Sequence, residues 1–320
     1  DGTAWQQLGN AFDFPQSLYA PQIKLLKGQP VIAFQEGRKL ADDQDEPNGN
    51  ILVYRWTGSE WQALGQVDTL GRDAAAPSLA VADDGTLTVA YFEFDGVSSN
   101  VFVKRWDGSV WQALGDALDI NPSRNAVFPS VVDDAGNPVV AWYEDRTGDL
   151  SRNLYVKRWT GTTWEQLGAS LNMNSQERAD TFSLVVDKNN RPVIAFSEFD
   201  QVGQSNNVYV KRWNGSGWVM LGTSGIANAS GPHLAMGENG QLVLAYRKCV
   251  AGRSQCTNED LYVARWERDS IASAYTWKVI GQTLEVNAAS TVYNLQLAVH
   301  NNQPVVAWHD SSDYHLHMKR

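Results

Sequence analysis

The chain has 320 residues, of which 43% are hydrophobic and 19% charged, and its formal net charge is −10. This composition is that of a protein with a sizeable core and excludes intrinsic disorder. The acidic balance, with lysine and arginine dispersed along the chain, argues against nucleic acid as a partner. No apolar run approaches the roughly 20 residues that span a bilayer, so we expect no membrane insertion.

Thirteen residues recur almost unchanged along the chain. In chain order they are "VYRWTGSEWQALG" (53–65), "VKRWDGSVWQALG" (103–115), "VKRWTGTTWEQLG" (156–168) and "VKRWNGSGWVMLG" (210–222). A glycine-containing turn between two β-prone segments is typical of a β-hairpin. The two tryptophans that flank each turn are therefore expected to form a cross-strand pair, as Trp106 and Trp111 illustrate.

A second phrase precedes each of these hairpins. It occurs six times, as "PVIAFQE" (30–36), "LTVAYFE" (87–93), "PVVAWYE" (138–144), "PVIAFSE" (192–198), "LVLAYRK" (242–248) and "PVVAWHD" (304–310). The shared alanines are 50 to 62 residues apart, which fits a four-stranded unit better than a helical repeat. In the second unit we expect strands over 77–82, 86–94, 101–106 and 110–115, with "DDG" and "DGS" as turns.

The two chain ends carry the halves of one incomplete repeat. The last residues are "MKR" and the first are "DGTAWQQLG", which together match the thirteen-residue phrase without its first tryptophan. We therefore predict an all-β fold, a six-bladed β-propeller of four-stranded antiparallel blades in one domain, 1–320. Residues 1–9 are expected to complete the blade formed by about 290–320, which would leave no exposed sheet edge.

This arrangement resembles bacterial propeller repeat proteins over the whole chain. It is similar to six-bladed fucose-binding lectins in blade count, length and the "WDGxxW" hairpin, here "WDGSVW". Those lectins use an arginine on the second strand and a glutamate on the third. This chain has Val89 or Ala90 and Lys104 or Arg105 there, so the resemblance implies their layout without their binding residues. Asp-box sialidases are a further comparison, but the turns "ADDGTLTV" and "VDDAGNPVV" lack the serine and tryptophan of the box.

Carboxylates recur where the second strands end. In a propeller these ends and the links between blades lie on one face, around the central channel. The candidate ligand-binding residues are Glu36, Glu93, Asp95, Glu144, Asp145, Glu198, Asp200 and Asp310. Paired carboxylates serve glycoside hydrolysis, but an acid and a base need different environments, whereas these residues repeat from blade to blade. Solvated or ion-paired carboxylates are the alternative, with little effect on stability when neutralised.

Two departures from the repeat suggest metal ligands. The loop 35–50 contains Asp43 and Asp45, which are candidate calcium ligands, with an acidic solvated loop as the alternative. The segment "WHDSSDYHLH" contributes His309, His315 and His317 as candidates for zinc or copper. The last two also fit as packing and capping substitutes. We expect no cofactor other than this possible calcium ion.

Cys249 and Cys256 lie close together in a segment without other metal-ligating side chains except acidic ones. A local disulfide fits this spacing, and such a bond persists in an oxidising compartment. Two free thiols are the alternative. A secreted or cell-surface location follows from the first interpretation.

The sequence thus favours an extracellular binding module for a carbohydrate or protein partner on the loop face. It is expected as a monomer or as a module of a larger chain. A glycoside hydrolase or lyase that uses channel-mouth carboxylates is the second hypothesis, and a structural spacer is the third. Whether the chain is an enzyme stays open, with the repetition of the carboxylates arguing against it.

Overall fold

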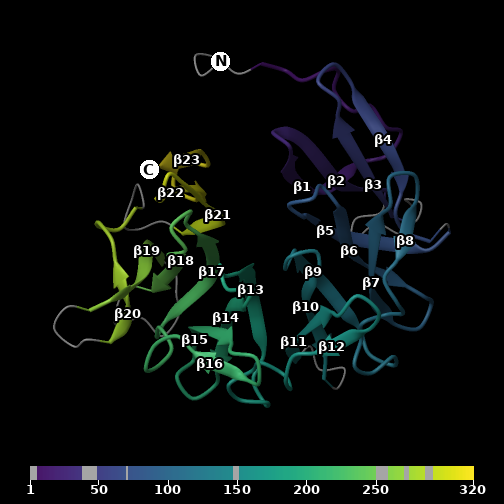
Figure 1. Ribbon diagram of the computed structural model, residues 1–320. Helices are drawn as coiled ribbons and strands as arrows, with labels where there is room; N and C mark the ends of the chain where they lie inside the picture. Colours follow the sequence, from purple (N-terminus) through teal and green to yellow (C-terminus); the bar gives the residue numbers. More distant parts are fainter. Residues whose placement is uncertain are drawn as a thin grey trace. The chain divides into compact units, whose positions relative to one another are not determined.

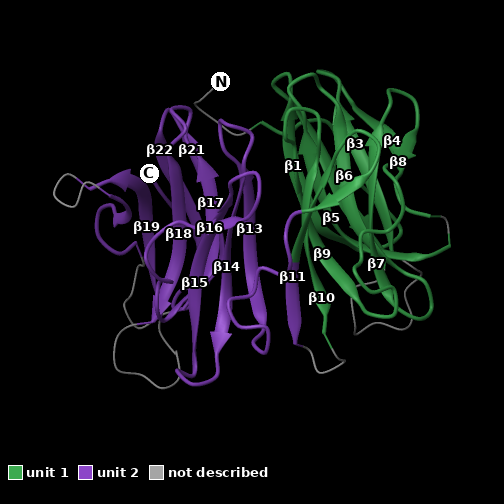
Figure 2. Ribbon diagram, turned by 60° about the horizontal axis from the view of Figure 1, so that its bottom comes forward, with its two compact units in different colours: residues 1–148, 155–166 green, residues 149–154, 167–320 purple. Residues whose placement is uncertain are grey.

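A computed structural model describes residues 6–37, 49–69, 71–146, 151–249, 259–269, 274–284 and 291–320. The chain divides into two compact units, coloured separately in Figure 2: Asp1–Gly148 with Tyr155–Gln166, and Asp149–Leu154 with Leu167–Arg320. All regular elements of the described residues are β-strands, and neighbouring strands pair antiparallel. Among those residues, no helix is long and apolar enough to cross a membrane.

Unit 1 contains three sheets whose strands follow one another in chain order (Figure 1). They are β1 (Leu18–Leu26), β2 (Gln29–Glu36), β3 (Asn50–Trp56) and β4 (Trp61–Gln66); β5 (Asp73–Val81), β6 (Leu87–Phe94), β7 (Ser99–Trp106) and β8 (Trp111–Ala113); and β9 (Ala126–Val132), β10 (Val139–Asp145), β11 (Arg152–Trp159) and β12 (Trp164–Gln166). The first strands of successive sheets contact each other, β1 with β5 and β5 with β9. Strand β11 straddles the boundary between the two units.

Unit 2 repeats this plan. Its strands are β13 (Ala179–Val186), β14 (Pro192–Asp200), β15 (Ser205–Trp213) and β16 (Trp218–Met220); β17 (Ala229–Met236), β18 (Leu242–Cys249), β19 (Glu259–Arg268) and β20 (Tyr275–Val279); and β21 (Val292–His300), β22 (Gln303–Asp310) and β23 (Leu316–Lys319). The six sheets, called blades 1 to 6 below, make the protein a six-bladed β-propeller, as the sequence predicted. Blade 6 has three strands in the described part of the chain, so its completion by residues 1–9 remains a prediction.

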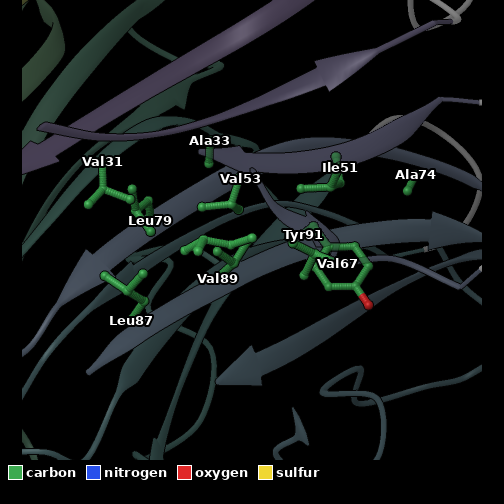
Figure 3. Packing of buried hydrophobic residues seen from close by; sticks show 11 residues of the cluster. Val31, Ala33, Ile51, Val53, Val67, Ala74, Leu79, Leu87, Val89 and Tyr91 are labelled. Atoms are coloured by element: carbon green, nitrogen blue, oxygen red, sulfur yellow. The ribbon is translucent and has the colours of Figure 1, made fainter. Parts of the chain in front are cut away.

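The core lies between successive blades of a unit. Figure 3 shows the junction of blades 1 and 2, where Val31 and Ala33 of β2 pack towards Val89 and Tyr91 of β6. Both faces of a second strand are covered in this way, which explains why these strands are continuous apolar runs rather than alternating ones. In unit 2, Val193 and other residues of blade 4 pack against blade 5 in the same manner.

The tryptophan pairs confirm the expected hairpins. Trp106 lies directly opposite Trp111, with ring centroids 5.4 Å apart, and the other four pairs have the same register. The second tryptophan of each pair also donates its indole N–H to a leucine carbonyl that ends the preceding repeat. These bonds are Trp61 to Leu8 (2.8 Å), Trp111 to Leu64 (3.0 Å), Trp164 to Leu114 (2.6 Å), Trp218 to Leu167 (2.7 Å) and Trp277 to Leu221 (2.9 Å).

Candidate functional site

Most of the predicted ligand-face glutamates are buried, contrary to the alternative that they are solvated. The side chains of Glu93, Glu144 and Glu198 are only 1 to 3% exposed. Each accepts one or two backbone N–H groups from the segment that links the preceding blade to its own. Glu144 accepts from Ile120 at 2.6 Å and from Asn121 at 2.8 Å.

The other two glutamates repeat this arrangement. Glu198 accepts from the N–H groups of Met173 at 2.7 Å and Asn174 at 2.8 Å, and Glu93 accepts from Thr69. Burial raises the pKa of Glu144 and of Glu198, while the backbone N–H groups oppose the rise. These carboxylates hold the links between blades, a role that sequence reasoning missed because their amide partners lie about 24 residues away.

The remaining carboxylates of the set differ in exposure. Asp310 is fully buried and accepts from the N–H and hydroxyl of Ser312, whereas Glu36 is half-buried. Asp95 is exposed, and Asp145 and Asp200 are half-buried. None of the described glutamates or aspartates is brought into a group of three or more that could hold a metal ion.

The surface aspartates shape turns on the loops after the second strands. Asp95 accepts from the N–H groups of Val97 at 2.8 Å and Ser98 at 2.9 Å, and these bonds lower its pKa. Asp200 accepts in the same way from Val202 at 2.9 Å. Asp145 instead accepts from the side chain of Asn125 at 3.0 Å. Asp95 and Asp200 thus order the loops that follow them, whereas Asp145 is tied to the link before β9, and all three carboxylates remain partly accessible.

The predicted metal ligands are only partly brought together. His317 contacts Asp313 at 2.9 Å and His315 contacts it at 3.4 Å, so these two histidines share a carboxylate. His309 pairs with Leu316, whereas His317 pairs with Trp308. Because neighbouring residues of a strand point to opposite faces, His309 and His317 lie on opposite sides of the sheet. The candidate calcium ligands Asp43 and Asp45 lie outside the described residues. So does Cys256, whereas Cys249 ends β18, and their disulfide remains a prediction.

A polar cavity of about 580 Å³ opens in unit 2 between blades 4 and 5, at the edge where the turns between their first and second strands lie. Its walls come from the turn after β13, from the third strand β15, from the turn before β18 and from the β19–β20 hairpin. Lys188, Arg191, Arg212 and Arg268 contribute positive charge, and Asp187 and Glu267 contribute negative charge. Sequence reasoning attended to the opposite loop face and did not find this cavity.

Trp266 and Tyr275 form the aromatic part of the cavity wall. Their rings are stacked, with centroids 5.9 Å apart and an interplanar angle of 22°. Tyr275 is 59% exposed, and Trp266 is less buried than Trp159 and Trp213, its counterparts in blades 3 and 4. An accessible aromatic pair beside charged donors suits a ligand with both an apolar face and polar substituents.

Comparisons with known proteins support the fold. No protein-family model and no curated protein matches the chain. A protein of unknown function from Dyadobacter fermentans is similar in structure, with a TM-score of 0.56, 14% identity and coverage of 94% of this chain and 93% of that one. An ulvan lyase bound to a saccharide has a TM-score of 0.57 and 13% identity, with 98% and 80% covered. An α-L-arabinanase of Penicillium chrysogenum in complex with arabinobiose has a TM-score of 0.52 and 14% identity, with 96% and 93% covered.

Proposed function

We propose that this protein is an extracellular glycan-binding module. The observation that carries the proposal is the cavity of unit 2, where a stacked tryptophan–tyrosine pair lies among arginine and aspartate side chains. Sugar rings combine an apolar face with hydroxyl groups, and such a wall offers both surfaces. The likeness of the fold to a polysaccharide lyase and an arabinanase is compatible with a glycan as the ligand.

The loop face is a second location for the ligand. There the candidates with exposed or half-buried carboxylates are Glu36, Asp95, Asp145 and Asp200. Replacing the three aspartates together by asparagine tests this location, because each carboxylate is at least partly accessible and asparagine keeps an acceptor oxygen for the donor that binds it. A protein partner on the same face remains the other form of this hypothesis.

A glycoside hydrolase or lyase is the second candidate function. It is favoured by the raised pKa of Glu144 and Glu198, since a general acid must hold its proton near neutral pH. Against it, the oxygens of both carboxylates accept backbone N–H groups, and the two environments are alike.

A glycan array combined with a turnover screen on oligosaccharides separates these functions. We expect binding without turnover, and the triple aspartate variant and Tyr275→Ala then show which location holds the glycan. Turnover that disappears in Glu144→Gln or Glu198→Gln, while the variant stays folded, would select the enzyme. If no glycan is bound and none is turned over, the proposal is contradicted, and a protein partner is the hypothesis that remains.

A further inference from the structure

An arginine precedes the first tryptophan of each hairpin, and in blades 2, 3 and 5 it has an acceptor in a turn of its own or the next blade. In blade 2, Arg105 donates to the carbonyl of Gly136 in blade 3 at 2.7 Å, and in blade 5, Arg265 donates to the carbonyl of Asn302 in blade 6 at 3.4 Å. In blade 3, Arg158 lies 3.0 Å from the carboxylate of Asp134. These arginines therefore have acceptors within the protein.

Blade 4 departs from this pattern because its turn has a lysine and an arginine where the turn of blade 3 has an aspartate and an asparagine. Asp187 accepts from Nε of Arg191 at 2.9 Å and lies 2.7 Å from Nη2 of the same residue. The motif arginine, Arg212, is left 3.8 Å from that carboxylate oxygen. Counted back from Pro138 and Pro192, the position of Asp134 in blade 3 is Lys188 in blade 4, and the position of Asn137 is Arg191. Two guanidinium groups thus share one carboxylate, which leaves one positive charge in excess.

Neighbouring groups do not remove this excess. Lys188 donates to the main-chain carbonyl of Glu238, and Glu267 lies 3.3 Å from Lys278. The side chain of Arg268 is exposed and makes no hydrogen bond or ion pair with the described residues. Burial and the charge of Arg191 lower the pKa of Arg212. Four cationic side chains against two anionic ones line this cavity, in a chain whose net charge is −10.

The hairpin of blade 5 places an aromatic wall beside these arginines. In blade 4 the hairpin pairing ends at Trp213 and Trp218, whereas in blade 5 it continues beyond Trp266 to pair Arg268 with Tyr275. Tyr275 therefore lies two residues before Trp277, on the same face of the hairpin, and its ring stacks on that of Trp266. The arginine excess and the aromatic extension come from different blades and meet in one cavity.

We propose that this cavity binds a saccharide that carries an anionic substituent, the carboxylate of a uronic acid or a sulfate ester. The apolar face of a sugar ring lies on Tyr275 and Trp266, and the anionic group is bound by Arg212 and Arg268. Guanidinium groups match both kinds of oxyanion geometrically. The cavity volume of about 580 Å³ is within the usual range of ligand sites. The inference rests on the proposed glycan-binding function and names its ligand class.

Isothermal titration calorimetry of the full chain tests this with three sugars of equal length: tetragalacturonate, sulfated galactotetraose and unmodified galactotetraose. We expect one or both anionic sugars to bind at least about tenfold more tightly than the neutral one. The comparison of the two anionic sugars distinguishes carboxylate from sulfate. The advantage is expected to shrink as sodium chloride rises, because salt screens the arginines.

Three variants locate the site. Arg191→Asn gives blade 4 the residue of blade 3, so that Arg212 can approach Asp187, and it should abolish the anionic preference with the fold intact. Arg268→Gln removes the exposed guanidinium and should weaken the anionic sugars selectively. Tyr275→Ala should weaken all three sugars. Tyr314→Ala, which removes a tyrosine 79% exposed outside the cavity, is the matched control and should change nothing.

The outcomes separate this inference from the proposed function. Equal affinity for the three sugars, lost in Tyr275→Ala, would overturn the anionic ligand class and leave glycan binding standing. Anionic binding unchanged in all three cavity variants would overturn the location. Absence of binding by every probe would overturn the inference, and the glycan array then decides the proposed function separately. Thermal melts of each variant ensure that lost binding is not lost folding.

Discussion

Glu144 and Glu198 occupy the same position in consecutive blades and accept the same pair of link amides. A carboxylate removed from water is costly unless hydrogen bonds compensate for its desolvation, and here backbone N–H groups supply them. The repetition that appeared to mark a ligand-binding face in the sequence therefore has a structural cause for these residues. Each fixes the path by which the chain passes from one blade to the next.

Glu198→Gln is expected to lower the free energy of unfolding by about 1–3 kcal/mol. The amide leaves one acceptor oxygen and turns an N–H₂ group towards a backbone N–H, so a buried donor loses its partner. Urea unfolding measures the change, and Asp200→Asn in the same blade is the control, since its half-buried side chain keeps an acceptor for its turn. An unchanged midpoint for Glu198→Gln would show that the link does not depend on this carboxylate.

His233 is expected to make stability depend on pH. Burial and the positive charge of Arg247 lower its pKa to about 4 from an ordinary value near 6.5. The unfolded chain therefore binds the proton first as pH falls, and stability is lost between about pH 6.5 and pH 4, by at most about 3 kcal/mol. NMR titration of the imidazole gives the pKa, and His233→Gln should flatten the pH dependence of unfolding. A pKa near 6.5 in the folded protein would contradict the expectation.

At the scale of elements, the sequence could predict the strands and hairpins because their signals are local. Glycine turns, β-branched runs and paired tryptophans lie within a dozen residues of one another, and the hairpins of Trp106 and Trp111 followed from them. The first strands of the blades were harder to predict from the sequence. Each of them carries a bulge, and Ala76 and Phe128 adopt positive φ there, although neither residue type signals this conformation.

Contacts between elements distant in sequence could not be predicted either. The cavity of unit 2 depends on Arg191 and Arg212 sharing the carboxylate of Asp187 and on a hairpin from the next blade that lies beside them. Each residue is unremarkable in the sequence, since charged residues in turns are common. Only the packing of blades 4 and 5 brings them together, and the repeated phrases show what the blades share rather than where one blade departs from the others.

The indole bond to the preceding repeat is expected to stabilise each junction by about 1 kcal/mol. Replacing Trp164 by benzothienylalanine keeps the ring size and removes the N–H that binds the carbonyl of Leu114. The same replacement at Trp159, whose indole has no hydrogen bond among the described residues, is the control and should be nearly neutral. Denaturant unfolding of the two variants gives the comparison, and equal effects at both positions would remove the bond as a source of stability.

For the whole molecule, the contacts of the N-terminal segment bear on how the repeat begins. Leu8 accepts the indole N–H of Trp61, as Leu64 does for the indole of Trp111. Gly9 has a positive φ, and an added Cβ would lie 3.0 Å from Trp56, the same close approach that Gly115 makes to Trp159 and Trp164. Leu8 and Gly9 thus make the same contacts with the tryptophan pair of blade 1 that Leu114 and Gly115, at the end of the blade 2 repeat, make with the tryptophan pair of blade 3.

Deletion of residues 1–9 should therefore destabilise the protein as a whole, with a melting temperature lower by at least about 5 °C. Blade 1 would lose the carbonyl partner of Trp61, and blade 6, with three strands described, would lose the segment that we expect to pair with β23 and would present an open edge. The control is a circular permutant that joins Arg320 to Asp1 through a short glycine linker and opens the chain in the exposed turn at Asp84. It should fold with nearly native stability, because the expected hairpin between the two ends becomes continuous. A deletion variant that melts like the intact chain would show that the first nine residues do not complete the last blade.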